Sequence, residues 1–160
     1  MDKRELLIFL HIVGGFLIVG GAGAVTALAV VASRSPRTRT IAATSHAAVL
    51  VSRLVISPGA IILVVFGTWL VAEYALYDFD EGWISGAYVI WIVSVAVGTG
   101  YLTPYSRRIR DKARALIADG VEESEELRVE ADAPLPKITG TLLNVLLIVA
   151  LYLMVVRPGD

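Results

Sequence analysis

The sequence predicts an all-α membrane protein: a four-helix transmembrane bundle with a long, kinked second helix and a helical cytoplasmic loop between the third and fourth helices. Of its 160 residues, 56% are hydrophobic and 18% are charged, and the mean hydropathy is +0.72. A soluble domain is usually about 45–50% apolar and about 25% charged, so this excess indicates that lipid is the solvent. Two further observations support this fold class: four long apolar stretches and an uneven distribution of Lys and Arg.

Four apolar stretches are long enough to cross a bilayer. They are Leu6–Ala32, Leu54–Ala72, Trp83–Tyr101 and Ile138–Val156. A hydrocarbon core about 30 Å thick needs roughly 20 helical residues at about 1.5 Å each. The first stretch is much longer than the ~7–15 apolar residues of a signal peptide, and three spans follow it, so we predict that it is retained. Residues 1–160 then form a single four-helix integral membrane domain.

The distribution of Lys and Arg predicts the orientation. Of the 14 such residues, four lie between the first two apolar stretches and seven lie between the last two, whereas three lie near the termini. Basic loops stay in the cytoplasm. We therefore predict a multi-pass protein of the cell membrane with both termini outside and both basic loops cytoplasmic.

The helical pattern of the second span begins before its apolar stretch, at about Ile41. A helix that began at Pro58 would have only the 15 residues 58–72, about 22 Å, before Glu73. We therefore predict a continuous helix that starts before Arg53 and bends at Pro58, because proline removes a backbone N–H from the helix. Arg53 is the predicted interface anchor, with its guanidinium group among the cytoplasmic headgroups.

The loop between the third and fourth spans divides by charge. Its first part, "TPYSRRIRDKARALIADG", predicts a basic helix that continues the third span, with one apolar face made of Ile109, Ala113, Leu116 and Ile117. The second part, "VEESEELRVEADAPLP", is acidic and then broken by proline. The basic helix either contacts anionic lipid or supplies ordinary cytoplasmic charge beside a solvated acidic helix. We favour the second interpretation.

An imidazole, His11, lies five residues inside the first span. Counting along the antiparallel spans places Glu73, Tyr88 and Tyr152 near its level, and a buried imidazole needs a polar partner. We predict that His11 points into the bundle and bonds to one of these three groups, as a structural tie between helices. The alternatives are a ligand for haem b or copper near the outer face, and a pH-sensitive or transport role.

A second polar layer lies nearer the cytoplasm. Its members come from all four spans: Thr26, Ser57, Ser94, Thr141 and Asn144. They form either interhelical hydrogen bonds or a site for a small polar solute, and we favour the hydrogen bonds because no charge lies deep in any span.

Pairs of small residues four apart favour close helix packing, within the bundle or between subunits. The sequence therefore leaves open whether the chain forms a homo-oligomer or binds another membrane protein. The pairs are Gly20/Ala24, Gly23/Ala27, Gly82/Gly86 and Ser94/Gly98.

Several stretches together resemble the Domain of Unknown Function 2269 family of predicted integral membrane proteins, over essentially the whole chain. They are "LHIVGGFLIVGG", "RLVISPGAIILVVFGTWLV", "YLTPYSRRIR" and "ALYLMVVRP". The resemblance implies a four-helix membrane protein without an assigned activity. The first of these stretches is also loosely similar to the copper resistance D-like and protoporphyrinogen oxidase-like membrane families. That similarity implies histidines within spans that serve copper or haem.

Composition also excludes several function classes. The chain has no cysteine, which rules out thiolate metal sites and thiol catalysis, and its net charge of −1 argues against nucleic-acid binding. No phosphate-binding loop, Ser–His–Asp pattern or zinc motif occurs in the sequence. We therefore predict a non-enzymatic accessory or scaffold protein without a cofactor, with the lipid bilayer as its main partner. The alternative is a haem- or copper-binding redox or transport protein that uses His11.

Overall fold

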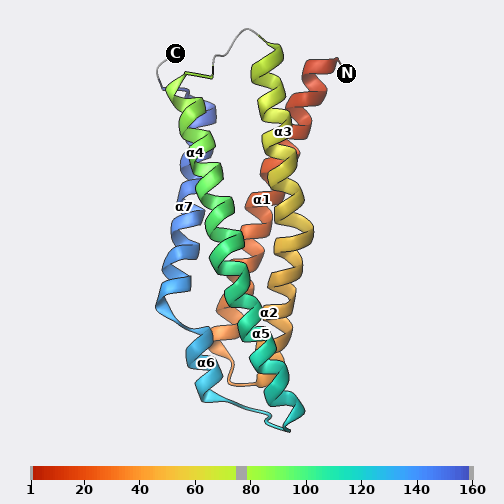
Figure 1. Cartoon of the computed structure of the whole chain (residues 1–160), viewed down its shortest axis with the longest axis vertical. Helices are drawn as coiled ribbons and strands as arrows, with labels where there is room; N and C mark the ends of the chain where they lie inside the picture. The colour runs from red at the N-terminus through yellow and green to blue at the C-terminus, as the bar shows by residue number, and fades with distance from the viewer. Residues whose placement is uncertain (1, 75–78, 159–160) are drawn as a thin grey trace.

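The computed structural model describes residues 2–74 and 79–158, and this part of the chain consists of helices joined by short turns (Figure 1). Four helical stretches are long and apolar enough to cross a membrane, which confirms the predicted four-helix membrane bundle. The elements are α1 (Lys3–Arg34), α2 (Thr38–Val51), the π-helical segment η1 (Ser52–Ile56), α3 (Ser57–Glu73), α4 (Gly82–Val97), the π-helical segment η2 (Gly98–Leu102), α5 (Thr103–Ala118), α6 (Glu125–Ala131) and α7 (Pro134–Val156).

The bundle is elongated, and both termini lie at the same end, called here the terminal end (Figure 1). At the opposite loop end, α6 lies beside α2 and α5. Along the bundle α1 packs mainly against α3, and α4 packs mainly against α7. The membrane-spanning part is therefore two helix pairs joined side by side.

Two helices begin before their predicted spans, because their first residues suit a helix start. Asp2 caps α1: its side chain accepts from the Glu5 N–H at 2.8 Å, and the Glu5 carboxylate accepts from the Asp2 N–H at 2.9 Å. Pro134 opens α7 at the first helical position, where no backbone N–H is required.

Glycine residues bring α1 and α3 into close contact. A Cβ atom on Gly14 would lie 2.5 Å from the backbone nitrogen of Leu63, and one on Gly59 would lie 3.1 Å from the carbonyl oxygen of Gly14. Two turns further along α1, a Cβ on Gly21 would lie 2.5 Å from the side chain of Ile56. No larger residue fits at Gly14 or Gly59 without a shift, so there the backbones of α1 and α3 pack directly against each other, and at Gly21 the backbone of α1 packs against a side chain of η1.

The small residues singled out in the sequence take little part in these contacts. A Cβ on Gly20, Gly23, Gly82 or Gly98 would meet no other atom within 4 Å. Gly86 alone of the glycines in the predicted pairs faces a neighbour, the side chain of Leu153 on α7. The tight contacts use glycines seven or eight residues apart instead, such as Gly14 and Gly21.

The second span is a continuous helix from Thr38 to Glu73, and the prediction that it begins before Arg53 is confirmed. At Pro58 the helix contains the π-helical segment η1 instead of a break. The Ser57 hydroxyl donates to the Ser52 carbonyl at 2.9 Å, five residues earlier. Proline leaves carbonyl groups of the preceding turn without their usual donor, and a wider turn with a hydroxyl donor accommodates this loss.

The same arrangement recurs where the third span continues into the basic helix. The segment η2 precedes Pro104, and the Thr103 hydroxyl donates to the Gly98 carbonyl at 2.9 Å. The helix therefore runs without interruption from Gly82 to Ala118.

The most deeply buried side chains lie at the loop end. Ile41 of α2, Ile109 of α5 and Leu127 of α6 are at most 2% exposed and form one core with Ala42 and Ala113. Leu116 and Ile117 pack against this core, which confirms the predicted apolar face of the basic helix. By contrast α7 buries none of its residues within the chain. This is the pattern expected of helices in lipid that continue into water, where apolar side chains must be covered.

We predict that Gly14→Ala destabilises the bundle by about 1–3 kcal/mol, because the added methyl group meets the backbone of α3. The measurement is thermal or denaturant unfolding in detergent micelles. Gly20→Ala on the same helix is the control, because its Cβ meets open space, and its effect should stay within about 0.5 kcal/mol. Equal stabilities of the two variants would contradict the close contact of α1 and α3.

Candidate functional site

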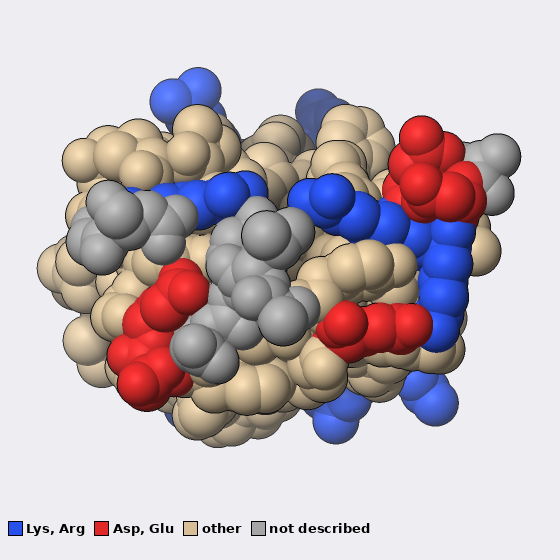
Figure 2. Space-filling view, turned by 90° about the horizontal axis from the view of Figure 1, so that it is seen from above, with Lys and Arg blue, Asp and Glu red and all other residues tan. Residues whose placement is uncertain are grey.

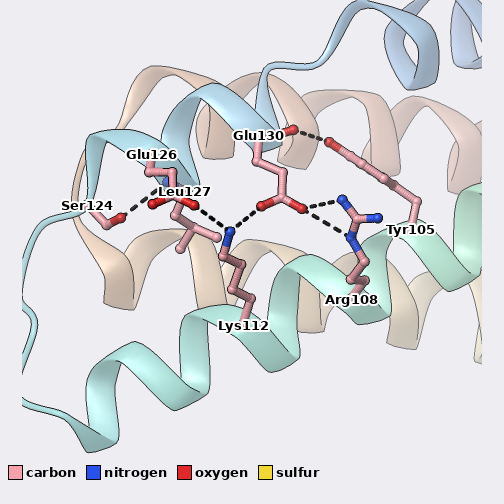
Figure 3. Close-up of polar contacts among 7 residues, drawn as sticks. All are labelled: Tyr105, Arg108, Lys112, Ser124, Glu126, Leu127 and Glu130. Atoms are coloured by element: carbon pink, nitrogen blue, oxygen red, sulfur yellow. Dashed lines mark hydrogen bonds and ion pairs between the residues drawn. The ribbon is translucent and has the colours of Figure 1, made fainter.

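A cluster of charged side chains closes the loop end (Figure 3). Glu130 of α6 points toward α5, where Lys112 donates to one carboxylate oxygen at 2.7 Å and Arg108 Nε donates to the other at 3.1 Å. Lys112 also donates to Glu126 at 3.0 Å. The two cations lie one turn apart on α5, so a single carboxylate reaches both.

The electrostatics of this cluster follow from its contacts. The side chain of Glu130 is only 19% exposed, and the hydrogen bonds from Lys112 and Arg108 hold its pKa below the usual carboxyl range. Burial, followed by the nearby charge of Glu130, raises the pKa of Tyr105 to about 12. The phenol therefore stays protonated at neutral pH and donates to the backbone carbonyl of Glu130.

The expectation of a solvated acidic helix holds for one face of α6, where Glu125 and Glu126 are exposed, but not for the face that carries Leu127 and Glu130. Leu127 is fully buried in the core below Glu130. Ser124 caps the helix by accepting from the Leu127 N–H at 3.2 Å. Because one face of α6 is apolar, the helix packs against α5, and its carboxylate comes into reach of the basic side chains.

Backbone contacts also fasten the segment before α6 to the turn between α1 and α2. The Thr38 N–H donates to the Glu122 carbonyl at 2.9 Å, and the Ser124 N–H donates to the Pro36 carbonyl at 3.0 Å. Arg128 Nη1 reaches the Ser33 carbonyl at 3.3 Å. The loop end is therefore one connected unit, and we call α2, α5 and α6 together the loop-end module.

Six arginines at the loop end are exposed and form no ion pair with a carboxylate in the part of the chain that the structure describes. They are Arg34, Arg37, Arg39, Arg53, Arg107 and Arg114. Arg53, the predicted anchor, lies in η1 next to the apolar stretch of the second span.

The terminal end carries charges of both signs. Seen from this end, acidic and basic side chains lie close together around the helix ends (Figure 2). Lys3 forms an ion pair with Glu73 and lies 5.4 Å from the ring centre of Trp69, whose indole N–H also donates to Glu73. The ion pair lowers the number of free charges here, in contrast to the unpaired arginines of the loop end.

His11 points toward α3, but its partner differs from the prediction. Its Nδ1 lies 2.9 Å from the backbone oxygen of Leu63, and its ring occupies the space that a side chain at Gly67 would fill. A carbonyl oxygen only accepts, so Nδ1 carries the hydrogen, and Nε2 of the neutral ring keeps its lone pair.

The three predicted partners of His11 are engaged elsewhere or point away. Glu73 bonds to Lys3 and Trp69, and Tyr88 shares a 2.6 Å hydrogen bond with Thr68. Tyr152 is 56% exposed and points away from His11. The depth count was wrong for Glu73, which pairs with Lys3 about two turns before His11, whereas His11 itself lies level with Leu63 and Gly67. The direction of each side chain around its helix, which counting does not give, also decides which groups meet.

The structure brings together only part of the second polar layer that the sequence predicted. Asn144 Nδ2 donates to the Thr26 hydroxyl at 3.1 Å, which links α7 to α1, and Thr26 donates to the Ala22 carbonyl at 2.9 Å. Ser94 does not join them: its hydroxyl is buried without a partner in the described part of the chain. A link between α3 and α4 that the sequence did not indicate comes from the Trp91 N–H, which donates to the Ala60 carbonyl at 3.2 Å.

Two hollows lie near these groups. One, of about 50 Å³, lies between the loop-end module and α1, and Ser45, Tyr105 and Ser106 are among the residues that line it. The other, of about 280 Å³, is a groove between α1 and α7 beside Thr26 and Asn144. Among the described residues no group of three or more His, Cys, Asp or Glu side chains is placed to hold a metal ion.

We predict that Glu130→Gln lowers the melting temperature at pH 7, because a neutral amide bonds more weakly to Lys112 and Arg108. The pKa of Glu130 is lower in the folded than in the unfolded state, so its contribution exists at neutral pH and is lost as the pH falls through the folded-state value. The difference between wild type and variant should therefore shrink below the ordinary carboxyl value of 4.5.

Glu126→Gln is the matched control, because this side chain is 85% exposed and, among the residues that the structure describes, bonds only to Lys112. It should change the melting temperature little at any pH. The same loss in both variants, or a difference that does not vary with pH, would show that Glu130 does not hold the module together.

Comparison with known proteins identifies the family. A family model described as "Predicted integral membrane protein (DUF2269)" matches residues 5–158. No curated protein and no solved structure gives a significant match, and the looser similarity of the first span to copper resistance D-like proteins is not seen. The chain belongs to the DUF2269 family of predicted integral membrane proteins.

Proposed function

We propose that this member of the DUF2269 family is a non-enzymatic accessory or scaffold component of the cell membrane, which holds a compact helical module outside the bilayer. The observation that carries the proposal is the continuity of the helices: α2 runs into the span of α3, and the span of α4 runs into α5. A module joined to its spans by two uninterrupted helices keeps a defined position at the membrane surface.

The contacts of the module fit a structural role. Its core of Ile41, Ile109 and Leu127 is as buried as that of a soluble domain, and Glu130 binds the two basic side chains that face it. The adjoining hollow of about 50 Å³ has room for a water molecule or two, which is small for a substrate. Helices held together in this way present a fixed surface to which a partner protein can bind.

We place the loop-end module in the cytoplasm and both termini outside. The loop end holds eleven of the 14 Lys and Arg residues, and six of its arginines lack an acidic partner in the described chain. The positive-inside rule counts Lys and Arg whatever acidic residues lie beside them, and it retains the end that holds most of them in the cytoplasm. Arg53, at the edge of the apolar stretch, is positioned to contact anionic lipid headgroups, with Arg107 as a second candidate.

This orientation predicts the behaviour of reporters. A reporter that is fluorescent only in the cytoplasm should stay dark at the C-terminus and should fluoresce when inserted at Gly120, in the turn between α5 and α6. The two fusions control each other for expression. Fluorescence from the C-terminal fusion alone would reverse the proposed topology.

One observation favours a second function, a haem- or copper-binding protein that uses His11. A histidine that binds a metal usually donates its other ring N–H to a carbonyl or carboxylate. His11 makes such a bond through Nδ1 to Leu63, which leaves Nε2 as the potential ligand atom. The same bond serves equally well as a tie between α1 and α3, and the scaffold proposal needs nothing more from it.

One preparation tests both functions. The scaffold proposal predicts that protein isolated from its own membranes in mild detergent has no Soret band, carries no stoichiometric iron or copper, and migrates in an assembly heavier than a dimer. Leu127→Ala, which empties a fully buried position, should dissociate the assembly, whereas Val129→Ala, at a residue 57% exposed on the same helix, should not. A Soret band or bound metal that is lost in His11→Ala would refute the scaffold proposal in favour of the cofactor.

A further inference from the structure

The groove between α1 and α7 contains a polar group whose hydrogen-bonding capacity is largely unused. Asn144 has two N–H donors and a carbonyl acceptor, and one N–H binds Thr26 at 3.1 Å. The second N–H and the carbonyl oxygen have no partner in the part of the chain that the structure describes. The Thr26 hydroxyl donates its own hydrogen to the Ala22 carbonyl, so toward Asn144 it acts only as an acceptor.

The position of Asn144 makes this unusual. It lies six residues inside the apolar stretch Ile138–Val156, about 9 Å along the helix. Acyl chains cannot bond to an amide, so a lipid-facing carboxamide at this depth is unfavourable unless another polar group approaches it.

The shape of the groove allows a helix to approach. It has a volume of about 280 Å³ and includes Gly23 on α1 and Ile148 on α7. A Cβ on Gly20 or Gly23 would meet no atom within 4 Å, so this side of α1 is both small and open. Small residues let a neighbouring helix come near enough for an amide to be reached.

We propose that this groove is the interface between two copies of the chain, in which the Asn144 side chains bond to each other. Copies inserted in the same direction are related by a two-fold axis along the membrane normal, so each residue lies at the depth of its counterpart, and a residue beside the axis meets it. A carboxamide is both donor and acceptor and therefore complements itself across such an axis. An unrelated partner would need its own polar group at this level, whereas a second copy supplies one necessarily.

The absence of cysteine from the sequence permits a direct test with single-cysteine variants. Ile148→Cys should give a disulfide-linked dimer when native membranes are oxidised. Leu142→Cys is the matched control, because it lies on the same helix with similar exposure, 58% against 66%, but outside the groove. It should give little or none.

Two further changes in the Ile148→Cys protein test the role of the amide. Asn144→Leu removes the carboxamide and should lower the cross-linked fraction by roughly three- to tenfold. Thr26→Val removes the bond within the chain but keeps the carboxamide, so it should leave the fraction nearly unchanged.

Several outcomes would overturn the proposal. Failure of Ile148→Cys to form a dimer would mean that lipid fills the groove, and equal cross-linking by Leu142→Cys would indicate random collision. An adduct with the mass of a different protein would assign the groove to that partner. An equal loss in Thr26→Val and Asn144→Leu would mean that Asn144 acts only within its own chain.

Discussion

The backbones of α1 and α3 meet at Gly14 and Gly59, and this contact sets how the first two spans pack. Burying apolar side chains gains little when the solvent is lipid, so helices in a membrane associate through close packing and polar contacts. Here the packing is of backbone on backbone, which only glycine permits. It fixes the register of the two helices and so brings the ring of His11 into the space beside Gly67 and within reach of the Leu63 carbonyl.

Burial differs between the two parts of these long helices. Within the spans many large apolar side chains stay exposed to lipid, and α7 buries none of its residues. At the loop end the same continuous helices bury Ile41 and Ile109 completely or nearly so and cover them with α6. Pro58 and Pro104 lie where the two regions meet, and in both places a π-helical segment with a hydroxyl donor keeps the helix continuous.

Two polar side chains at membrane depth bond to the backbone of a neighbouring helix and not to another side chain. His11 and Trp91 both bond to backbone carbonyls of α3, whereas the hydroxyl groups of Thr68 and Tyr88 bond to each other. A helix offers a carbonyl at every residue, and each has a second lone pair beyond its helical bond. Where a glycine opens the way, the backbone is therefore the nearest acceptor, and polar side chains elsewhere stay free for contacts such as that of Asn144 with Thr26.

The number of long apolar helices, the continuity of the second one through Pro58 and the apolar face of α5 were all predictable from the sequence. Each follows from length, helical period and proline chemistry along one segment. The α1–α3 glycine contact could have been suspected from the seven-residue spacing of Gly14 and Gly21, but Gly20 and Gly23 look equally suitable in the sequence. Three contacts were not predictable in this way: which glycines face a helix, the bond of His11 to Leu63, and the bond of Glu130 to Arg108. Each of these depends on the rotation of a helix about its axis, and that rotation is set by packing between segments far apart in the chain.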